Sequence, residues 1–237
     1  MRLKIECNLE KNIITTSYNR KILSFFKKSL ELYDKDIEKI YYDEPHEKDM
    51  SFSCFFPIEK IENDKIYLKE NNFKIFLTFN SIIDGIHYYN SFINARNKHI
   101  EFKLNENIFK IVNIAKINEK TINENVAIFQ TLSPIMIREK IDRKKEWFHI
   151  LDEKGIEVLK KNICYSLRNR FSLEKLNELE IIPINIKRVI VSFYDIKFPT
   201  TKGIFAIKGD KEILEYFYKS GLSSKKSSGF GMLELIK

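Results

Sequence analysis

Residues 3–7 read Leu3-Lys4-Ile5-Glu6-Cys7 and alternate apolar with polar side chains, which is the pattern of a half-buried strand. From Tyr18 onward the apolar spacing becomes that of one helical face, at Leu23, Phe26, Leu30 and Tyr33. Extended stretches follow at 51–56, 65–68 and 73–79. A second helical face comes next, at Ile82, Ile86, Tyr89 and Ile93, and then paired strands at 99–104 and 108–115. This order of elements predicts a ferredoxin-like βαββαβ domain.

The second half of the chain repeats the order of elements without repeating the residues. Strands are expected at 125–137, 184–194, 203–208 and 229–236, with helices around 156–167 and 210–220. Asp210 is suited to cap the start of the last helix and Gly221 its end. The sequence therefore predicts an α+β protein of tandem ferredoxin-like (RRM-like) domains, at 1–120 and 121–237, joined through the polar run 118–124.

Composition sets broad limits on function. The 237 residues carry 41 Lys and Arg against 33 Asp and Glu, a net charge of +8, and 43% are hydrophobic. Disordered chains are much poorer in apolar residues. No apolar run approaches the roughly 18 residues of a membrane span, and the N-terminus does not read as a signal peptide. We therefore expect a cytoplasmic protein with no membrane partner, and the charge favours a polyanionic partner only weakly because acids interrupt most basic stretches.

Neither the cysteines nor the histidines show a metal-binding pattern. Cys7, Cys54 and Cys164 are widely spaced in apolar surroundings, and the four histidines show no paired spacing. The sequence thus predicts reduced, buried thiols, no metal and no cofactor.

Glycine is unusually unevenly distributed. Only seven of the 237 residues are glycine, which is about 3%, whereas ordinary proteins have roughly 7%. Three of the seven, Gly221, Gly229 and Gly231, lie among the last 17 residues, interleaved with serine and with Lys225 and Lys226. Glycines let backbone N–H groups approach a phosphate closely, while serines add donors and lysines add charge. A flexible turn explains the composition equally well, and the spacing of a Walker loop is absent.

The same segment carries a family resemblance. Gly221-Leu222-Ser223 followed by Gly229-Phe230-Gly231 resembles the C-terminal glycine-rich motif of the RAMP superfamily of CRISPR-associated proteins, and residues 225–232 are similar to the ending of the Cas6 endoribonucleases. Shorter similarities occur in the family's order at residues 2–5, 18–19, 51–53 and 131–135. Ser223 departs from the pattern, because the family usually has glycine there.

The resemblance implies an activity. Cas6 enzymes cut the repeat of precursor CRISPR RNA without a metal, by attack of a 2′-hydroxyl that leaves a 2′,3′-cyclic phosphate and a 5′-hydroxyl. It implies His46 as general base or acid and Lys48 as electrostatic stabiliser. The family often places a tyrosine where this chain has Ser29, and Tyr33, one turn further along the helix, is the candidate substitute.

The glycine-rich segment and a basic run together form the candidate RNA-binding surface. The residues expected to contact RNA are Gly221, Ser223, Ser224, Lys225, Lys226, Ser227, Ser228, Gly229 and Gly231, with Arg138, Arg143 and Lys144 from the basic run 138–145. Arg168 and Arg170 are further candidates. The basic run fits a solvated hairpin equally well, and for Trp147 and Phe148 core packing is the expectation over stacking on bases.

Two other functions stay open. One is a non-cleaving, repeat-binding subunit of a CRISPR effector complex, which Ser29 favours; the other is an unrelated two-domain RNA-binding protein. Expected partners are the precursor CRISPR RNA repeat, other effector subunits and a second copy of the chain as a homodimer.

Overall fold

The computed structural model describes residues 1–43, 48–142, 145–194 and 196–237. The chain forms two compact units. Unit 1 comprises residues 1–119 with 192–196, and unit 2 comprises residues 120–191 with 197–237. Each unit is described by itself.

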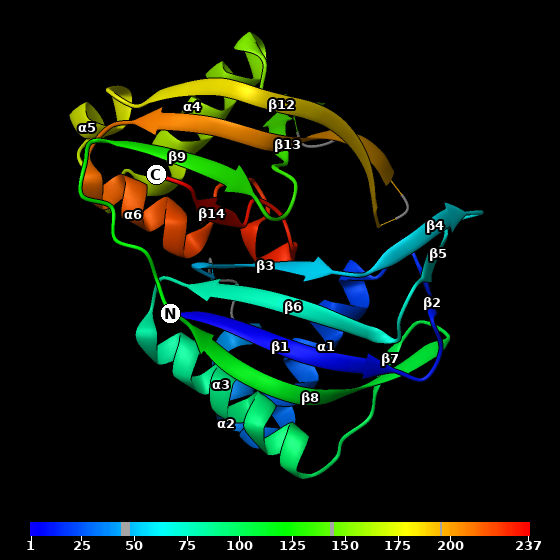
Figure 1. The fold of residues 1–237 in the computed structure, drawn as a ribbon. Helices are drawn as coiled ribbons and strands as arrows, with labels where there is room; N and C mark the ends of the chain where they lie inside the picture. The colour runs from blue at the N-terminus through cyan, green and yellow to red at the C-terminus, as the bar shows by residue number, and fades with distance from the viewer. Residues whose placement is uncertain (44–47, 143–144, 195) are drawn as a thin grey trace. The chain divides into compact units, whose positions relative to one another are not determined.

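Unit 1 is built on a five-stranded antiparallel sheet (Figure 1). Its order is β3-β6-β1-β8-β7, from strands β1 (Arg2–Leu9), β3 (Met50–Phe55), β6 (Asn72–Phe79), β7 (Phe102–Leu104) and β8 (Asn107–Ile117). Ile5 of β1 lies opposite Ile75 of β6 and Ile114 of β8. The four strands β3, β6, β1 and β8 have the order and connections of the predicted ferredoxin-like domain.

Helices α1 (Asn19–Tyr33), α2 (Lys35–Tyr42) and α3 (Ile82–Asn97) belong to the same unit. Alternate residues of β1 are buried in its core, as the sequence pattern predicts, and the ring of Phe25 from α1 stacks on Phe92 from α3 at 5.3 Å. Asp34 separates α1 from α2, because its carboxylate accepts hydrogen bonds from the backbone N–H groups of Asp36 and Ile37.

The buried face of α3 differs from the prediction. The helix forms where expected, but Ile82 is 66% exposed and Ile86 is exposed too. The fully buried face carries Tyr88, Phe92 and Ala95, while Tyr89 and Ile93 of the predicted face pack half-buried against the core. The two aromatic rings bury more apolar area than isoleucines do, and they complete the cluster around Phe25, so they determine which face packs inward.

Unit 1 also contains a second, smaller sheet, and the sequence predicted only part of it. Strands β2 (Ile13–Thr15), β5 (Lys65–Leu68) and β4 (Ile58–Glu62) form an antiparallel sheet in the order β2-β5-β4. Only β5 was expected. A two-residue turn joins β4 to β5, and both of its residues, Asn63 and Asp64, have positive φ. Such turns match the twist of a hairpin.

Unit 2 repeats the topology of unit 1. Its sheet has the order β12-β13-β9-β14, from β9 (Val126–Thr131), β12 (Glu180–Phe193), β13 (Ile196–Lys208) and β14 (Leu233–Leu235). Helices α4 (Glu153–Leu167) and α6 (Lys211–Ser220) share a core with the sheet residues Phe129 and Phe205. The hairpin β10 (Ile137–Lys140) and β11 (Glu146–His149) and the short α5 (Leu173–Asn177) are inserted. The predicted fold class, α+β with tandem ferredoxin-like domains, is confirmed.

The ends of α6 are as the sequence predicts. The Asp210 carboxylate accepts a hydrogen bond from the Glu212 N–H, and Gly221 follows the helix with φ 85°. The last strand is shorter than expected, since residues 229–232 lie outside it. No helix in the described ranges is long and apolar enough to span a membrane.

Candidate functional site

The glycine loop, residues 221–232, joins α6 to β14. Gly221, Gly229 and Gly231 all have positive φ, at 85°, 88° and 69°. A Cβ on Gly231 would lie 2.1 Å from the Leu222 carbonyl oxygen. The concentration of glycine therefore meets a backbone requirement, because side-chain-bearing residues rarely adopt these angles.

Hydrogen bonds fix this loop to the segment that follows β9. The Gly231 N–H donates to the Pro134 carbonyl at 2.8 Å. The Ser223 hydroxyl bonds to both the N–H and the carbonyl of Met136, at 3.0 and 3.1 Å. The Ser224 hydroxyl accepts from the Arg138 N–H at 3.1 Å. These two serines, predicted as RNA contacts, thus hold the loop in shape.

Gly231→Ala is expected to destabilise the protein. Forcing alanine into positive φ costs about 1–2 kcal/mol, and the contact with the Leu222 carbonyl adds to this. We expect a lower melting temperature in thermal unfolding. Ser227→Ala in the same loop is the matched control and should change stability by less than about 0.5 kcal/mol. An unchanged melting temperature for the glycine variant would contradict the requirement.

Lys225 of this loop belongs to the basic cluster, defined here as Arg138, Lys140 and Lys225. The hydrogen bond from the Arg138 N–H to the Ser224 hydroxyl ties β10 to the loop, and the Arg138 guanidinium pairs with Glu146 at 3.1 Å. Burial, then the positive charges of Arg138 and Lys140, lower the pKa of Lys225. The structure thus brings together the two basic segments that the sequence placed 87 residues apart, counted from Arg138 to Lys225. The other predicted residues of this run, Arg143 and Lys144, lie outside the described residues.

Tyr216 of α6 contacts two more cations, Lys226 of the loop and Arg170. The Lys226 ammonium donates to the Tyr216 hydroxyl at 2.9 Å, and the Arg170 guanidinium lies 4.7 Å from the centre of the Tyr216 ring. Ser227 and Ser228 lie half-buried in the short 3-10 helix η1 (Lys226–Ser228). Arg170 is therefore close to the glycine loop, whereas Arg168 stacks on Tyr165 at 4.3 Å.

In unit 1, Lys48 is half-buried against an aromatic ring. Its ammonium lies 3.3 Å from the centre of the Tyr42 ring. Burial, then the nearby positive charge of Lys27, lower its pKa to about 8, and the negative charge of Glu38 opposes the shift. Lys27 itself pairs with Glu38 at 3.2 Å. A lysine held in this way is charged at neutral pH in a partly desolvated place, where its charge acts strongly on a neighbouring anion.

Of the other two predicted catalytic residues, Tyr33 and His46, the structure describes only Tyr33. Tyr33 is exposed at the end of α1, and its hydroxyl accepts a long hydrogen bond of 3.5 Å from the Asn90 amide. Ser29 is fully buried in unit 1, and its hydroxyl has no hydrogen-bond partner among the described residues. His46 lies outside the described residues, so its role stays a prediction. Within the described ranges, no three His, Cys, Asp or Glu side chains are grouped so as to hold a metal ion.

Sequence reasoning did not find the residues that tune Lys48. Lys27 and Glu38 come from α1 and α2, and no spacing in the sequence relates them to Lys48. Tyr42 is close to His46 in the sequence, but nothing local to it indicates that its ring holds Lys48. Tyr216 was not singled out either, because its place in α6 reads simply as an apolar helical position.

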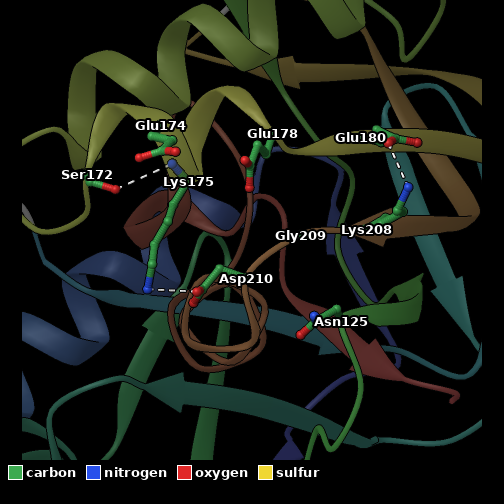
Figure 2. Close-up of a pocket in the computed structure, with 9 residues that line it drawn as sticks. All are labelled: Asn125, Ser172, Glu174, Lys175, Glu178, Glu180, Lys208, Gly209 and Asp210. Carbon is green, nitrogen blue, oxygen red and sulfur yellow. Dashed lines mark hydrogen bonds and ion pairs between the residues drawn. The ribbon is translucent and has the colours of Figure 1, made fainter.

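Unit 2 also has a polar pocket of about 690 Å³ (Figure 2). Two ion pairs lie in its lining, Lys175 with Asp210 at 2.7 Å and Lys208 with Glu180 at 2.9 Å. Asp210 precedes α6, whereas the glycine loop follows it, so the pocket and the loop lie at opposite ends of this ten-residue helix. The pocket is therefore separate from the basic cluster.

Comparisons with known proteins find one matching family model and several similar solved structures. Residues 117–235 match the family model described as CRISPR associated protein Cas6, C-terminal. Among solved structures, the protein is similar to one described as a Cas6-related gene from Pyrococcus furiosus, with TM-score 0.85, 24% identity and coverage of 100% of this chain and 98% of that chain. It is similar also to one described as a RAMP protein binding different RNA substrates, with TM-score 0.83, 22% identity and full coverage of both chains. A comparison with curated proteins finds no match.

The fold and the site define a tandem ferredoxin-like protein whose second domain has a glycine loop and a basic cluster before its last strand. The family match covers half of the chain and includes the whole glycine-rich motif. The chain belongs to the Cas6 family of CRISPR-associated proteins.

Proposed function

We propose that the protein is a metal-independent endoribonuclease that cuts the repeat of precursor CRISPR RNA. Family membership supports the RNA substrate, and a similar structure is described as binding RNA. The observation that carries the proposal of cleavage is Lys48, a partly desolvated cation with a pKa of about 8, two residues after His46.

In this mechanism the RNA supplies its own nucleophile. His46 removes the proton from the 2′-hydroxyl beside the scissile phosphate, which suits an imidazole because its ordinary pKa of about 6.5 lets it exchange protons near neutrality. The 2′-oxygen attacks the phosphorus in line, the bond to the 5′-oxygen breaks, and that oxygen takes up a proton. The products are a 2′,3′-cyclic phosphate and a 5′-hydroxyl.

Lys48 stabilises the negative charge that grows on the phosphorane. Its ammonium is held against the Tyr42 ring at 3.3 Å, so little freedom is lost when the phosphate arrives. Below its pKa of about 8 the amine is charged, and the charge is present at the pH at which histidine acts as a base.

The glycine loop and the basic cluster are proposed to grip the RNA backbone. The loop is fixed by its hydrogen bonds to residues 134–138, so it would meet phosphates without first becoming ordered. Arg138 and Lys225 would then supply charge to neighbouring phosphates.

A second candidate, a repeat-binding subunit that does not cut, is favoured by Ser29. The position at which the family often has a catalytic tyrosine is buried in unit 1 and carries only a hydroxymethyl group. Tyr33, the proposed substitute, bonds to Asn90. This arrangement fits an RNA-binding protein that lacks one part of the catalytic site.

Incubation with the repeat RNA of its own CRISPR array in excess EDTA tests the two candidates. We expect one cut that leaves a cyclic phosphate, and no cut in RNA with a 2′-deoxy nucleotide before the scissile phosphate. Mass spectrometry of the fragments identifies the ends. Tight binding without cleavage would favour the second candidate, and cleavage that needs a divalent metal would refute the mechanism.

A further inference from the structure

Strand β4 forms the outer edge of the small sheet of unit 1. In the order β2-β5-β4 it pairs with β5 on one side, and all five of its residues are exposed. Figure 1 shows β4 and β5 extending from the end of the sheet to which β3 belongs. An exposed edge offers unpaired backbone N–H and C=O groups to another strand.

The hairpin geometry shows which groups face outward. Because Asn63 and Asp64 form a two-residue turn, Glu62 and Lys65 are the hydrogen-bonded pair that closes it. Hydrogen-bonded and non-bonded pairs alternate along the strand. The N–H and C=O of Ile61 therefore point away from β5, toward the open edge.

The side chains of this edge differ between its two faces. Ile61 lies opposite the buried Ile66 and is 60% exposed. The register shifts by one residue between Ile58 and Lys60, so Ile58 lies opposite the buried Leu68 on the same face as Ile61. The other face carries Lys60, opposite Tyr67, and Glu62. Lys60 and Glu62 form an exposed ion pair at 2.9 Å. The edge thus presents an apolar row on one face and opposite charges on the other.

We propose that β4 pairs in antiparallel fashion with β4 of a second copy of this chain, about a two-fold axis at Ile61. The two copies of Ile61 then exchange both backbone hydrogen bonds and pack side by side. Lys60 of each copy lies opposite Glu62 of the other, which gives two opposite-charge pairs across the interface. The two small sheets become one continuous six-stranded sheet.

The charges on β4 favour the axis at Ile61 over other registers, and a second copy of the chain over RNA. An axis at Lys60 would instead place two lysines opposite each other. An RNA strand does not fit, because Glu59, Lys60 and Glu62 give the strand a net negative charge in a chain of charge +8. The proposal is independent of the proposed catalytic function. Since five-residue strands bury less area than standard interfaces, we expect a weak dimer that forms with increasing concentration.

Charge reversal tests the proposal by sedimentation velocity over a concentration series. The unaltered protein should approach twice the mass of the chain, whereas Lys60→Glu and Glu62→Lys should each remain monomeric because like charges then face each other. The double variant K60E/E62K restores both pairs and should dimerise again. Lys154→Glu, at an exposed ion pair of α4, is the matched control and should dimerise as the unaltered protein does.

Three results would overturn the proposal: a monomer at every concentration, a dimer insensitive to either single reversal, or a double variant that stays monomeric. Thermal unfolding of each variant checks that the fold persists. Loss of an exposed ion pair changes stability little, so the single variants are expected to melt close to the unaltered protein.

Discussion

His46→Ala is expected to slow cleavage of repeat RNA severely while leaving binding intact. Removing a general base from an attack by the 2′-hydroxyl slows it by about 10²–10⁴-fold. Binding is expected to persist because the proposed grip is made by the glycine loop and the basic cluster. Single-turnover cleavage with labelled RNA measures the first quantity, and a filter-binding titration measures the second.

Two further measurements separate a lost base from a damaged fold. Imidazole added to the solution should restore part of the activity of the alanine variant, since the small molecule replaces the missing ring. His99→Ala, at an exposed histidine after α3, is the matched control and should cleave normally. Cleavage at an undiminished rate in the His46 variant would refute the assignment.

Lys48→Ala is expected to reduce cleavage by about 10²-fold, because one electrostatic stabiliser of the transition state is lost. The pH dependence gives a sharper test. Lys48 is charged below its pKa of about 8 and neutral above it, so the rate should fall as the pH rises through this value. On the acid side the rate should fall below about pH 6.5, where an ordinary histidine base becomes protonated. A bell-shaped profile is therefore expected.

Two variants identify the alkaline limb. In Lys48→Arg the cation persists at every accessible pH, so the fall near pH 8 should disappear. Lys27→Ala removes the positive charge that lowers the pKa of Lys48 and should move the limb to higher pH. Lys39→Ala, at an exposed lysine of α2 that pairs with Asp36, is the control and should leave the profile unchanged. An alkaline limb that stays in place in both test variants would show that another group causes it.

The sequence predicted the order of strands and helices well, because alternating and helical apolar spacings are local properties. The sequence-based prediction was wrong where packing partners far away in the sequence determine which residues are buried. Ile82 and Ile86 have the right spacing for a buried face. Tyr88 and Phe92 face inward instead, because their rings pack against phenylalanine rings of α1. Trp147 was expected in the core and is exposed, whereas Phe148 is half-buried and stacks on Phe198 at 4.3 Å.

The candidate site shows the same division. The positive φ of Gly221, Gly229 and Gly231 agrees with the backbone requirement inferred from composition alone. Ser223 and Ser224 look like phosphate donors in sequence, but backbone groups more than 80 residues away engage both hydroxyls. Nothing local to these serines signals those partners. The surroundings of Lys48 were hidden for the same reason.

Because Trp147 is exposed, the intrinsic fluorescence of the protein can be used to follow RNA binding. Trp147 is the single tryptophan of the chain, and it lies on β11, opposite Glu139 and one position along from the pair that contains Arg138. Its indole is 51% exposed, with the Lys145 ammonium 5.7 Å from the ring. Fluorescence excited at the indole therefore arises from the hairpin that also carries Arg138 and Lys140, so unlabelled RNA that binds this hairpin can be titrated by following the quenching of one emitter.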